Sequence, residues 1–270
     1  MTALLNVVRI ALAGLWTALL GLPLLATIYS TYAYGLVRSL FGRKDILDRI
    51  LEWNARLAGT VAQKLWSGVL LALGGIRVRV RELKPVDWTV SHVVCANHAS
   101  LFDVLALVRV IPPPFRFVAK RELLRWPIIG WALRPAGQIV IDRANRAKAL
   151  GRLAREAVRK IPGQVVFFVE GTRSKTGRLQ PFKKGAFHFS VDTRLPILPA
   201  AIAGSYAVLA KLPWWRMQPG REIEVTFCPP IDPPPARDEE EDRRAVESLL
   251  RRTYEQIRDI LEPATQPAVS

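Results

Sequence analysis

The chain is built around one segment, which reads Val93-Val94-Cys95-Ala96-Asn97-His98-Ala99-Ser100-Leu101-Phe102-Asp103. The mostly apolar run 90–96 predicts a buried strand, and residues 101–110 predict a helix. Open α/β sheets place their sites where strands end. His98 would follow the strand and Asp103 would begin the helix, so Asp103 could hold one imidazole nitrogen and leave the other as a base. Alternatively, the two residues only cap the helix start.

Strand-like and helix-like patterns alternate along the rest of the chain. Helices are predicted at 101–110, at 144–161 and in a segment that ends near residue 193. This alternation predicts an α/β fold with a mixed, largely parallel sheet flanked by helices. Strands are predicted at 76–81, 90–96, 115–119, 138–142, 164–169, 196–203 and 222–227.

The amino-terminal region predicts membrane attachment. Residues 10–37 contain no charged side chain, and about 20 apolar residues suffice to span a bilayer as a helix. A cleavable signal peptide is the competing interpretation, which the length of the run and the lack of a clear cleavage site disfavour. Residues 45–73 predict a second helix. It would form a hairpin with the first, lie in the membrane interface, or be an ordinary amphipathic domain helix.

Charge and proline content suggest a division of the chain into three parts. Basic residues follow the apolar run at Arg38, Arg43, Lys44 and Arg49, which places the following domain on the cytoplasmic side by the positive-inside rule. We predict membrane-anchoring helices at 1–75 and a catalytic α/β domain at 76–228. Residues 229–270 would form a proline-rich linker and a charged amphipathic helix.

The composition favours anionic partners. The formal net charge is +16, from 39 Lys and Arg against 23 Asp and Glu. Such an excess attracts nucleic acid, anionic lipid head groups or phosphorylated small molecules. The two cysteines, Cys95 and Cys228, lie in apolar strand-like runs, so they indicate core residues and neither a disulfide framework nor a metal site.

Two other predicted strands also end in polar residues. One ends in Asp142-Arg143, and another is followed by Glu170-Gly171-Thr172-Arg173. If these strands neighbour the one before His98, a base lies beside at least two guanidinium groups. Arginine binds phosphate bidentately, so the pattern indicates a substrate with a hydroxyl and a phosphate group. Taken singly, each arginine could equally be an ordinary surface residue.

Four sequence blocks resemble those of a known family. Asn97-His98-x4-Asp103 resembles the signature of the glycerolipid acyltransferases, notably the 1-acyl-sn-glycerol-3-phosphate (lysophosphatidate) acyltransferases. A His-x4-Asp pair recurs by chance, but four blocks in the family's order are a strong signal, and they span roughly residues 76–228. The other three are Gly137-Gln138-Ile139-Val140-Ile141-Asp142-Arg143, Glu170-Gly171-Thr172-Arg173-Ser174 and Leu195-Pro196-Ile197-Leu198-Pro199-Ala200.

The resemblance implies roles for individual residues. His98 would deprotonate the acceptor hydroxyl without an acyl-enzyme, and Asp103 would orient it. Lys120 matches a lysine proposed to help at the oxyanion, although it could equally contact phosphate or solvent. Because a carboxylate repels phosphate, we expect Glu170 to hold Arg143 or Arg173 in place. Binding of the acceptor, chiefly its phosphate, is implied for Asn97, Arg143, Glu170, Gly171, Thr172 and Arg173.

The resemblance also implies a reaction and a location. A membrane-bound enzyme would transfer a fatty acyl group from acyl-CoA or acyl carrier protein to the 2-hydroxyl of lysophosphatidate, giving phosphatidate. No metal or cofactor is needed in this mechanism. The expected partners are the lipid acceptor, the acyl donor and an anionic membrane surface, with no nucleic acid. The catalytic domain would face the cytoplasm, at a bacterial inner membrane.

Two alternatives remain open. The first is an acyltransferase for another acceptor, such as glycerol 3-phosphate, another lysophospholipid or an amino-acid lipid. The second is a membrane-anchored basic domain without activity that binds anionic lipid or nucleic acid. On the favoured interpretation, His98→Ala and Asp103→Ala should each abolish turnover and leave the fold intact.

Overall fold

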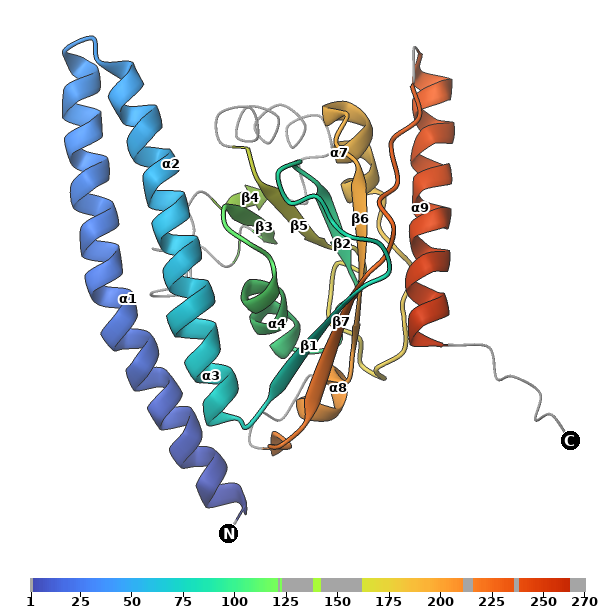
Figure 1. Ribbon diagram of the computed structural model, residues 1–270, viewed down its shortest axis with the longest axis horizontal. Helices are drawn as coiled ribbons and strands as arrows, with labels where there is room; N and C mark the ends of the chain where they lie inside the picture. The colour runs from blue at the N-terminus through green and yellow to red at the C-terminus, as the bar shows by residue number, and fades with distance from the viewer. Residues whose placement is uncertain are drawn as a thin grey trace, which may run out of the picture.

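The computed structural model describes residues 2–120, 122, 138–141, 162–210, 216–235 and 238–262. In these residues a helical hairpin, a central sheet and a C-terminal helix follow one another across the molecule (Figure 1). The hairpin pairs α1 (Thr2–Leu40) with a second helical run. That run comprises α2 (Lys44–Val61), the π-helical segment η1 (Ala62–Ser67) and α3 (Gly68–Leu73).

The described strands form a mixed, largely parallel sheet, as the sequence predicts. Its order is β1-β7-β6-β2-β5-β3-β4, and of these neighbouring pairs β6 and β7 run antiparallel. Every other pair runs parallel. The bounds are β1 (Arg77–Glu82), β2 (Val93–Ala96), β3 (Phe115–Lys120), β4 (Ile139–Ile141), β5 (Gln164–Phe168), β6 (Ile197–Ala203) and β7 (Glu222–Phe227).

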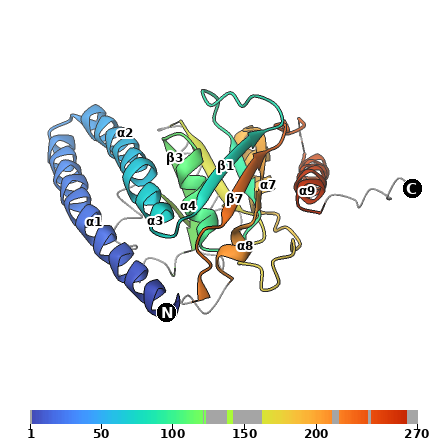
Figure 2. The same ribbon diagram turned by 60° about the horizontal axis from the view of Figure 1, so that its bottom comes forward.

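Both faces of the sheet are covered. One face packs on α4 (Phe102–Val110) and on the second run of the hairpin, and the other packs on α7 (Gly185–Thr193) and α9 (Glu239–Leu261). Both views place α9 on the far side of the sheet from the hairpin (Figure 1 and Figure 2). A strand buried on both faces is apolar throughout, which explains the unbroken run Val93–Ala96.

β2 begins later than the predicted strand 90–96, because a turn precedes it. Oδ1 of Asp87 accepts hydrogen bonds from the backbone N–H of Thr89 at 2.9 Å and from its hydroxyl at 2.6 Å. The backbone N–H of Val90 then donates to the Asp87 carbonyl. Val90 is 43% exposed. Local side-chain bonding of this kind competes with a strand ladder.

The two helical runs of the hairpin make close and polar contacts. A Cβ at Gly35 would lie 3.1 Å from the side chains of both Ile50 and Leu47, so the absence of a side chain lets the helices approach. The hydroxyl of Thr31 donates to Oδ1 of the fully buried Asn54 at 2.9 Å. The second helix of the predicted pair therefore packs on the first, and the hairpin interpretation is confirmed.

The outer side of α1 is exposed and apolar. Within the described ranges, α1 is the one helix that is long and apolar enough to cross a membrane, with a mean hydropathy of 1.9 in its most apolar 18-residue stretch, which lies within Leu4–Leu40. Only 6% of that stretch is buried. Contiguous exposed apolar surface of this extent marks an interaction site. Its large exposed members include Leu4, Leu5, Val7, Val8, Leu12, Leu15, Leu19, Leu22, Tyr29, Tyr32, Tyr34, Leu36 and Val37.

The C-terminal helix α9 belongs to the core of the second sheet face. Oδ1 of Asp238 accepts from the backbone N–H groups of Glu240 and Glu241 at 2.9 and 2.8 Å, a standard N-cap. The predicted apolar stripe is buried on the sheet, with Leu249 and Ile257 fully covered. The division of the chain at residues 75 and 228 stays a prediction.

Candidate active site

Two of the three predicted polar strand ends lie side by side. β2 pairs with β5 in parallel, with Ala96 opposite Phe168, so the segments after both strands emerge at one edge of the sheet. β4 is not a neighbour of β2, because β5 and β3 lie between them. At about 4.8 Å per strand spacing, the end of β4 lies about 14 Å from the end of β2. Arg143, which follows β4, lies outside the described residues.

His98 and Asp103 meet as the sequence predicts. Nδ1 of His98 lies 2.9 Å from Oδ2 of Asp103, with the Asp103 side chain fully buried and that of His98 16% exposed. The same oxygen accepts from the backbone N–H groups of Ala99 and Ser100, each at 2.7 Å. Asp103 therefore holds both the backbone turn that precedes α4 and the imidazole of His98.

The imidazole of His98 is fixed in orientation. Its ring stacks on Phe168 with centroids 3.9 Å apart and planes 18° apart. Because a carboxylate only accepts, Nδ1 carries the proton and Nε2 carries the lone pair. In the part of the chain that the structure describes, Nε2 has no hydrogen-bond partner. This is the geometry of a general base that awaits a proton from a substrate.

Glu170 anchors the backbone of His98. Its Oε1 accepts from the His98 N–H at 2.8 Å, and its Oε2 accepts from the side-chain amide of Gln180 at 2.8 Å. The expectation that Glu170 holds Arg173 is wrong, because no ion pair joins these two described residues. The reason is position: Glu170 points back to the end of β2. An interaction with Arg143 falls outside the described residues.

Burial changes the protonation of Glu170. The residue is only 3% exposed, and this burial raises its pKa to about 7, with a smaller contribution from the charge of Asp103. The two hydrogen bonds that it accepts oppose the rise. Near neutral pH, Glu170 is therefore about half protonated while it accepts the hydrogen bond from the His98 N–H.

We expect the stability of the protein to fall from pH 4.5 to pH 7 relative to that of Glu170→Gln. In this range an unfolded carboxyl is ionised while the folded one, with a pKa of about 7, stays protonated. The folded state binds the extra proton, so unfolding free energy falls by about 1.4 kcal/mol per pH unit, on the order of 3 kcal/mol in all. Urea unfolding of both proteins across this range measures the difference. Parallel profiles would contradict the raised pKa.

The loop after β5 hydrogen-bonds both the backbone N–H and the backbone carbonyl of His98. The backbone N–H of Ser174 donates to the carbonyl of His98 at 2.7 Å, so both peptide groups of His98 are held from this loop. Gly171 has φ +76, a conformation that glycine adopts without strain. Thr172 is exposed and Arg173 is half-buried at this edge. The structure thus brings the third sequence block to the backbone of His98.

Asn97 and Lys120 are placed differently from the other predicted residues. Both heteroatoms of the Asn97 amide bond the backbone of Ile202, at 3.0 Å to its carbonyl and 2.7 Å from its N–H. Asn97 therefore ties the end of β2 to β6, a contact that the sequence did not predict. Lys120 is the last residue of β3, and its side chain lies outside what the structure describes.

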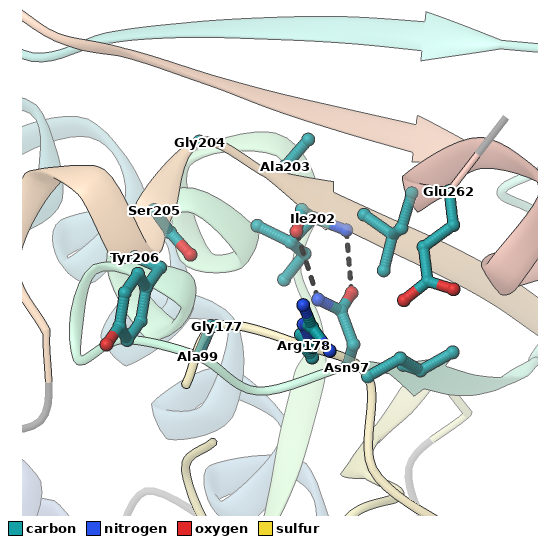
Figure 3. A pocket seen from close by; sticks show the side chains of 12 residues that line it. Asn97, Ala99, Gly177, Arg178, Ile202, Ala203, Gly204, Ser205, Tyr206 and Glu262 are labelled. Carbon is teal, nitrogen blue, oxygen red and sulfur yellow. Dashed lines mark hydrogen bonds between the residues drawn. The ribbon is translucent and has the colours of Figure 1, made fainter. Parts of the chain in front are cut away.

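A pocket of about 510 Å³ lies on the β6 side of residues 97–99. Figure 3 shows it between the end of β6 and the loop around residue 178. The sequence does not predict this pocket, because its walls come from segments that lie far apart in the chain. Its lining comprises Asn97, Ala99, Gly177, Arg178, Leu179, Ile202, Ala203, Gly204, Ser205, Tyr206, Leu261 and Glu262.

The site holds a base but no evident serine nucleophile. The hydroxyl of Ser100 donates to the carbonyl of Leu209 at 2.7 Å, which directs it away from His98. Among the described side chains, no group of three or more His, Cys, Asp or Glu could hold a metal ion. The geometry therefore supports deprotonation of a substrate hydroxyl.

The chain is similar to known acyltransferases. Residues 77–203 match the family model described as Acyltransferase. A 1-acyl-sn-glycerol-3-phosphate acyltransferase of Cocos nucifera is 39% identical over 138 residues, 50% of this chain and 44% of that protein. The alpha enzyme of that name from Mus musculus is 36% identical over 161 residues, 59% of this chain and 56% of that protein. The enzyme of that name from Escherichia coli is 33% identical over 167 residues, 61% of this chain and 66% of that protein.

A solved structure covers more of the chain. The crystal structure of the 1-acyl-sn-glycerophosphate acyltransferase PlsC from Thermotoga maritima aligns with a TM-score of 0.59 and 26% identity. That alignment covers 91% of this chain and 98% of the crystallised chain. By contrast, the matches to the curated relatives span about half to two thirds of the length of those proteins.

Proposed function

We propose that this chain, which belongs to the lysophosphatidate acyltransferase family, transfers a fatty acyl group from a thioester donor to lysophosphatidate. The acyl group would go to the 2-hydroxyl and give phosphatidate. The observation that carries the proposal is the 2.9 Å contact between His98 and Asp103 at the end of β2. The curated relatives named for this reaction support the choice of acceptor.

The proposed reaction uses His98 first as a base and then as an acid. Nε2 of His98 takes the proton of the 2-hydroxyl as the alcohol oxygen attacks the thioester carbonyl. The tetrahedral intermediate then collapses, the C–S bond breaks, and the thiol leaves with the proton from the imidazolium. Asp103 stabilises the imidazolium between these steps. Base catalysis of this kind is typically worth about 10² to 10⁴ in rate.

The acceptor phosphate would lie at the end of β5. Thr172 and Arg173 lie in the loop whose Glu170 and Ser174 hydrogen-bond the His98 backbone, and a guanidinium holds phosphate through paired hydrogen bonds. Arg143 and Lys120 are the further proposed cations, Arg143 for phosphate and Lys120 for the developing oxyanion. Fixing the phosphate would place the 2-hydroxyl at Nε2, which supplies the positional part of catalysis.

The hairpin would attach the domain to the lipid that it modifies. The exposed apolar side of α1 suits burial in a bilayer, and the side-chain amide of Asn6 donates to the carbonyl of Met217 at 3.0 Å. This bond ties α1 to the catalytic domain. We propose a catalytic domain on the cytoplasmic face, held to anionic lipid by its basic charge at about 1 kcal/mol per cation near the surface.

Acyl transfer by the detergent-solubilised full chain tests the proposal. Acyl-CoA and acyl carrier protein would be offered as donors, with lysophosphatidate, glycerol 3-phosphate and lysophosphatidylcholine as acceptors. Phosphatidate, identified by mass spectrometry, is the expected product. A product from another acceptor alone would move the assignment to that substrate. No product from folded protein, with salt-dependent binding to nucleic acid or anionic vesicles, would favour the binding-domain alternative.

We expect Arg173→Ala to raise the KM for lysophosphatidate by roughly 10- to 100-fold, since hydrogen bonds to charged groups contribute about 1.5–3 kcal/mol. The kcat at saturating acceptor should change little. An exposed arginine on α9, Arg251, provides the control substitution Arg251→Ala, which should leave both constants unchanged. A rise in the KM for the thioester instead would show that Arg173 serves the donor.

A further inference from the structure

The pocket beside β6 contains an unsatisfied polar group. Ser205 is 1% exposed, and its Oγ has no hydrogen-bond partner. Figure 3 shows this hydroxyl on the side of β6 that faces the loop at Gly177 and Arg178. A buried hydroxyl without a partner costs about 1–3 kcal/mol. A ligand that bonds Ser205 would remove this cost.

The pocket lies beside the turn that carries His98, between the end of β6 and the loop that follows β5. Its wall includes Asn97 and Ala99, the two chain neighbours of His98. The His98 ring itself stacks on Phe168 of β5, where Thr172 and Arg173 follow. The β6 wall of the pocket therefore reaches this turn from the strand that pairs with β2 opposite to β5.

The lining is mixed in character. Leu179, Ile202 and Leu261 provide apolar walls, whereas Ser205 and the exposed guanidinium of Arg178 provide polar groups. Glu262 adds one carboxylate to the lining, which disfavours an occupant that is anionic along its whole length. A volume of about 510 Å³ lies in the usual range of small-molecule sites, about 300–1,000 Å³.

We propose that this pocket binds the 4′-phosphopantetheine arm of the acyl donor. The inference rests on the proposed acyl transfer, in which a thioester must reach His98 while the acceptor phosphate occupies the β5 side. The arm is a slender chain with two amide groups, which Ser205 Oγ can bond, and its phosphate end would meet Arg178. Coenzyme A and acyl carrier protein carry the same arm, so either donor fits.

Substitution of Ser205 and Arg178 tests the pocket by direct binding. Calorimetry would measure the Kd of the full chain for coenzyme A, for acyl carrier protein bearing its arm, and for pantetheine without phosphate. Ser205→Ala should weaken all three by roughly 3- to 10-fold, the loss of one hydrogen bond. Arg178→Ala should weaken the two phosphate-bearing ligands by roughly 5- to 10-fold and leave pantetheine unchanged. Arg251→Ala is the matched surface control.

Ser205→Ala keeps the fold, because it removes a buried hydroxyl that has no hydrogen-bond partner. Its thermal stability should equal or exceed that of the wild type. Wild-type Kd values for both Ser205→Ala and Arg178→Ala would overturn the proposal, as would failure of the wild type to bind any of the three ligands. A weaker Kd for lysophosphatidate in both variants would reassign the pocket to the acceptor.

The same assay separates this inference from the proposed function. Binding of coenzyme A that depends on Ser205, without transfer to any acceptor, would support the arm site and refute the reaction. Normal transfer with unchanged donor binding in both variants would support the reaction and refute the arm site. Equal losses with coenzyme A and with acyl carrier protein would show that the shared arm is what the pocket binds.

Discussion

Replacing His98 by alanine should lower kcat by about 10² to 10⁴, the range for loss of a positioned general base. The structure supports this size of effect, because Nδ1 is committed to Asp103 at 2.9 Å and the ring is stacked on Phe168. The imidazole is thus held in one tautomer and one plane before substrate arrives. Stability should change modestly, since loss of the ring stacking costs about 0.5–1.5 kcal/mol.

His188 supplies a matched control for this substitution. It is an exposed histidine on α7, so His188→Ala should keep wild-type kcat and KM. Single-turnover rates of acyl transfer, with saturating donor and acceptor, would be compared for the three proteins. A His98→Ala enzyme within a few-fold of wild type would remove His98 from the base role, even if the family assignment stood.

Replacing Asp103 by asparagine should lower kcat by a similar order, about 10² or more, while KM for the acceptor changes little. An amide oxygen at the Oδ2 position can still accept from the N–H groups of Ala99 and Ser100. It cannot stabilise an imidazolium as a carboxylate does. The amide NH₂ would occupy the place of Oδ1, which is buried without a partner, so we expect a further loss of about 1–3 kcal/mol in stability.

Asp103→Ala should behave differently from Asp103→Asn. The sequence predicts that Asp103→Ala keeps its fold, but the Asp103 carboxylate accepts two backbone N–H bonds at 2.7 Å in addition to the bond from the imidazole. Alanine would leave the N–H groups of Ala99 and Ser100 without this acceptor, at about 1.5–3 kcal/mol for each bond to the charged group. The free energy of unfolding in urea should fall in the order wild type, Asp103→Asn, Asp103→Ala. Equal stability of Asp103→Asn and Asp103→Ala would show that these two hydrogen bonds contribute nothing.

The sequence by itself predicted the described strands and the meeting of His98 with Asp103. Apolar runs bounded by polar turns predict most strands of the sheet. β2 and residues 165–168 of β5 can be recognised without knowing their partners, because burial on both faces makes them apolar. The His98–Asp103 pair is likewise local, since five residues across a strand-to-helix turn bring the two side chains together. Local patterns of this kind can be recognised without knowing which strands are neighbours in the sheet.

Only the tertiary structure decided which strand ends are neighbours. It set β5 beside β2 and put β4 beyond β3, and it turned Glu170 toward the backbone of His98 and not toward Arg173. It also placed Ser205, more than 100 residues from His98, in a pocket beside the turn that carries His98. Strand order and side-chain pairing depend on contacts between segments far apart in the chain, and periodicity within one segment carries no information about them.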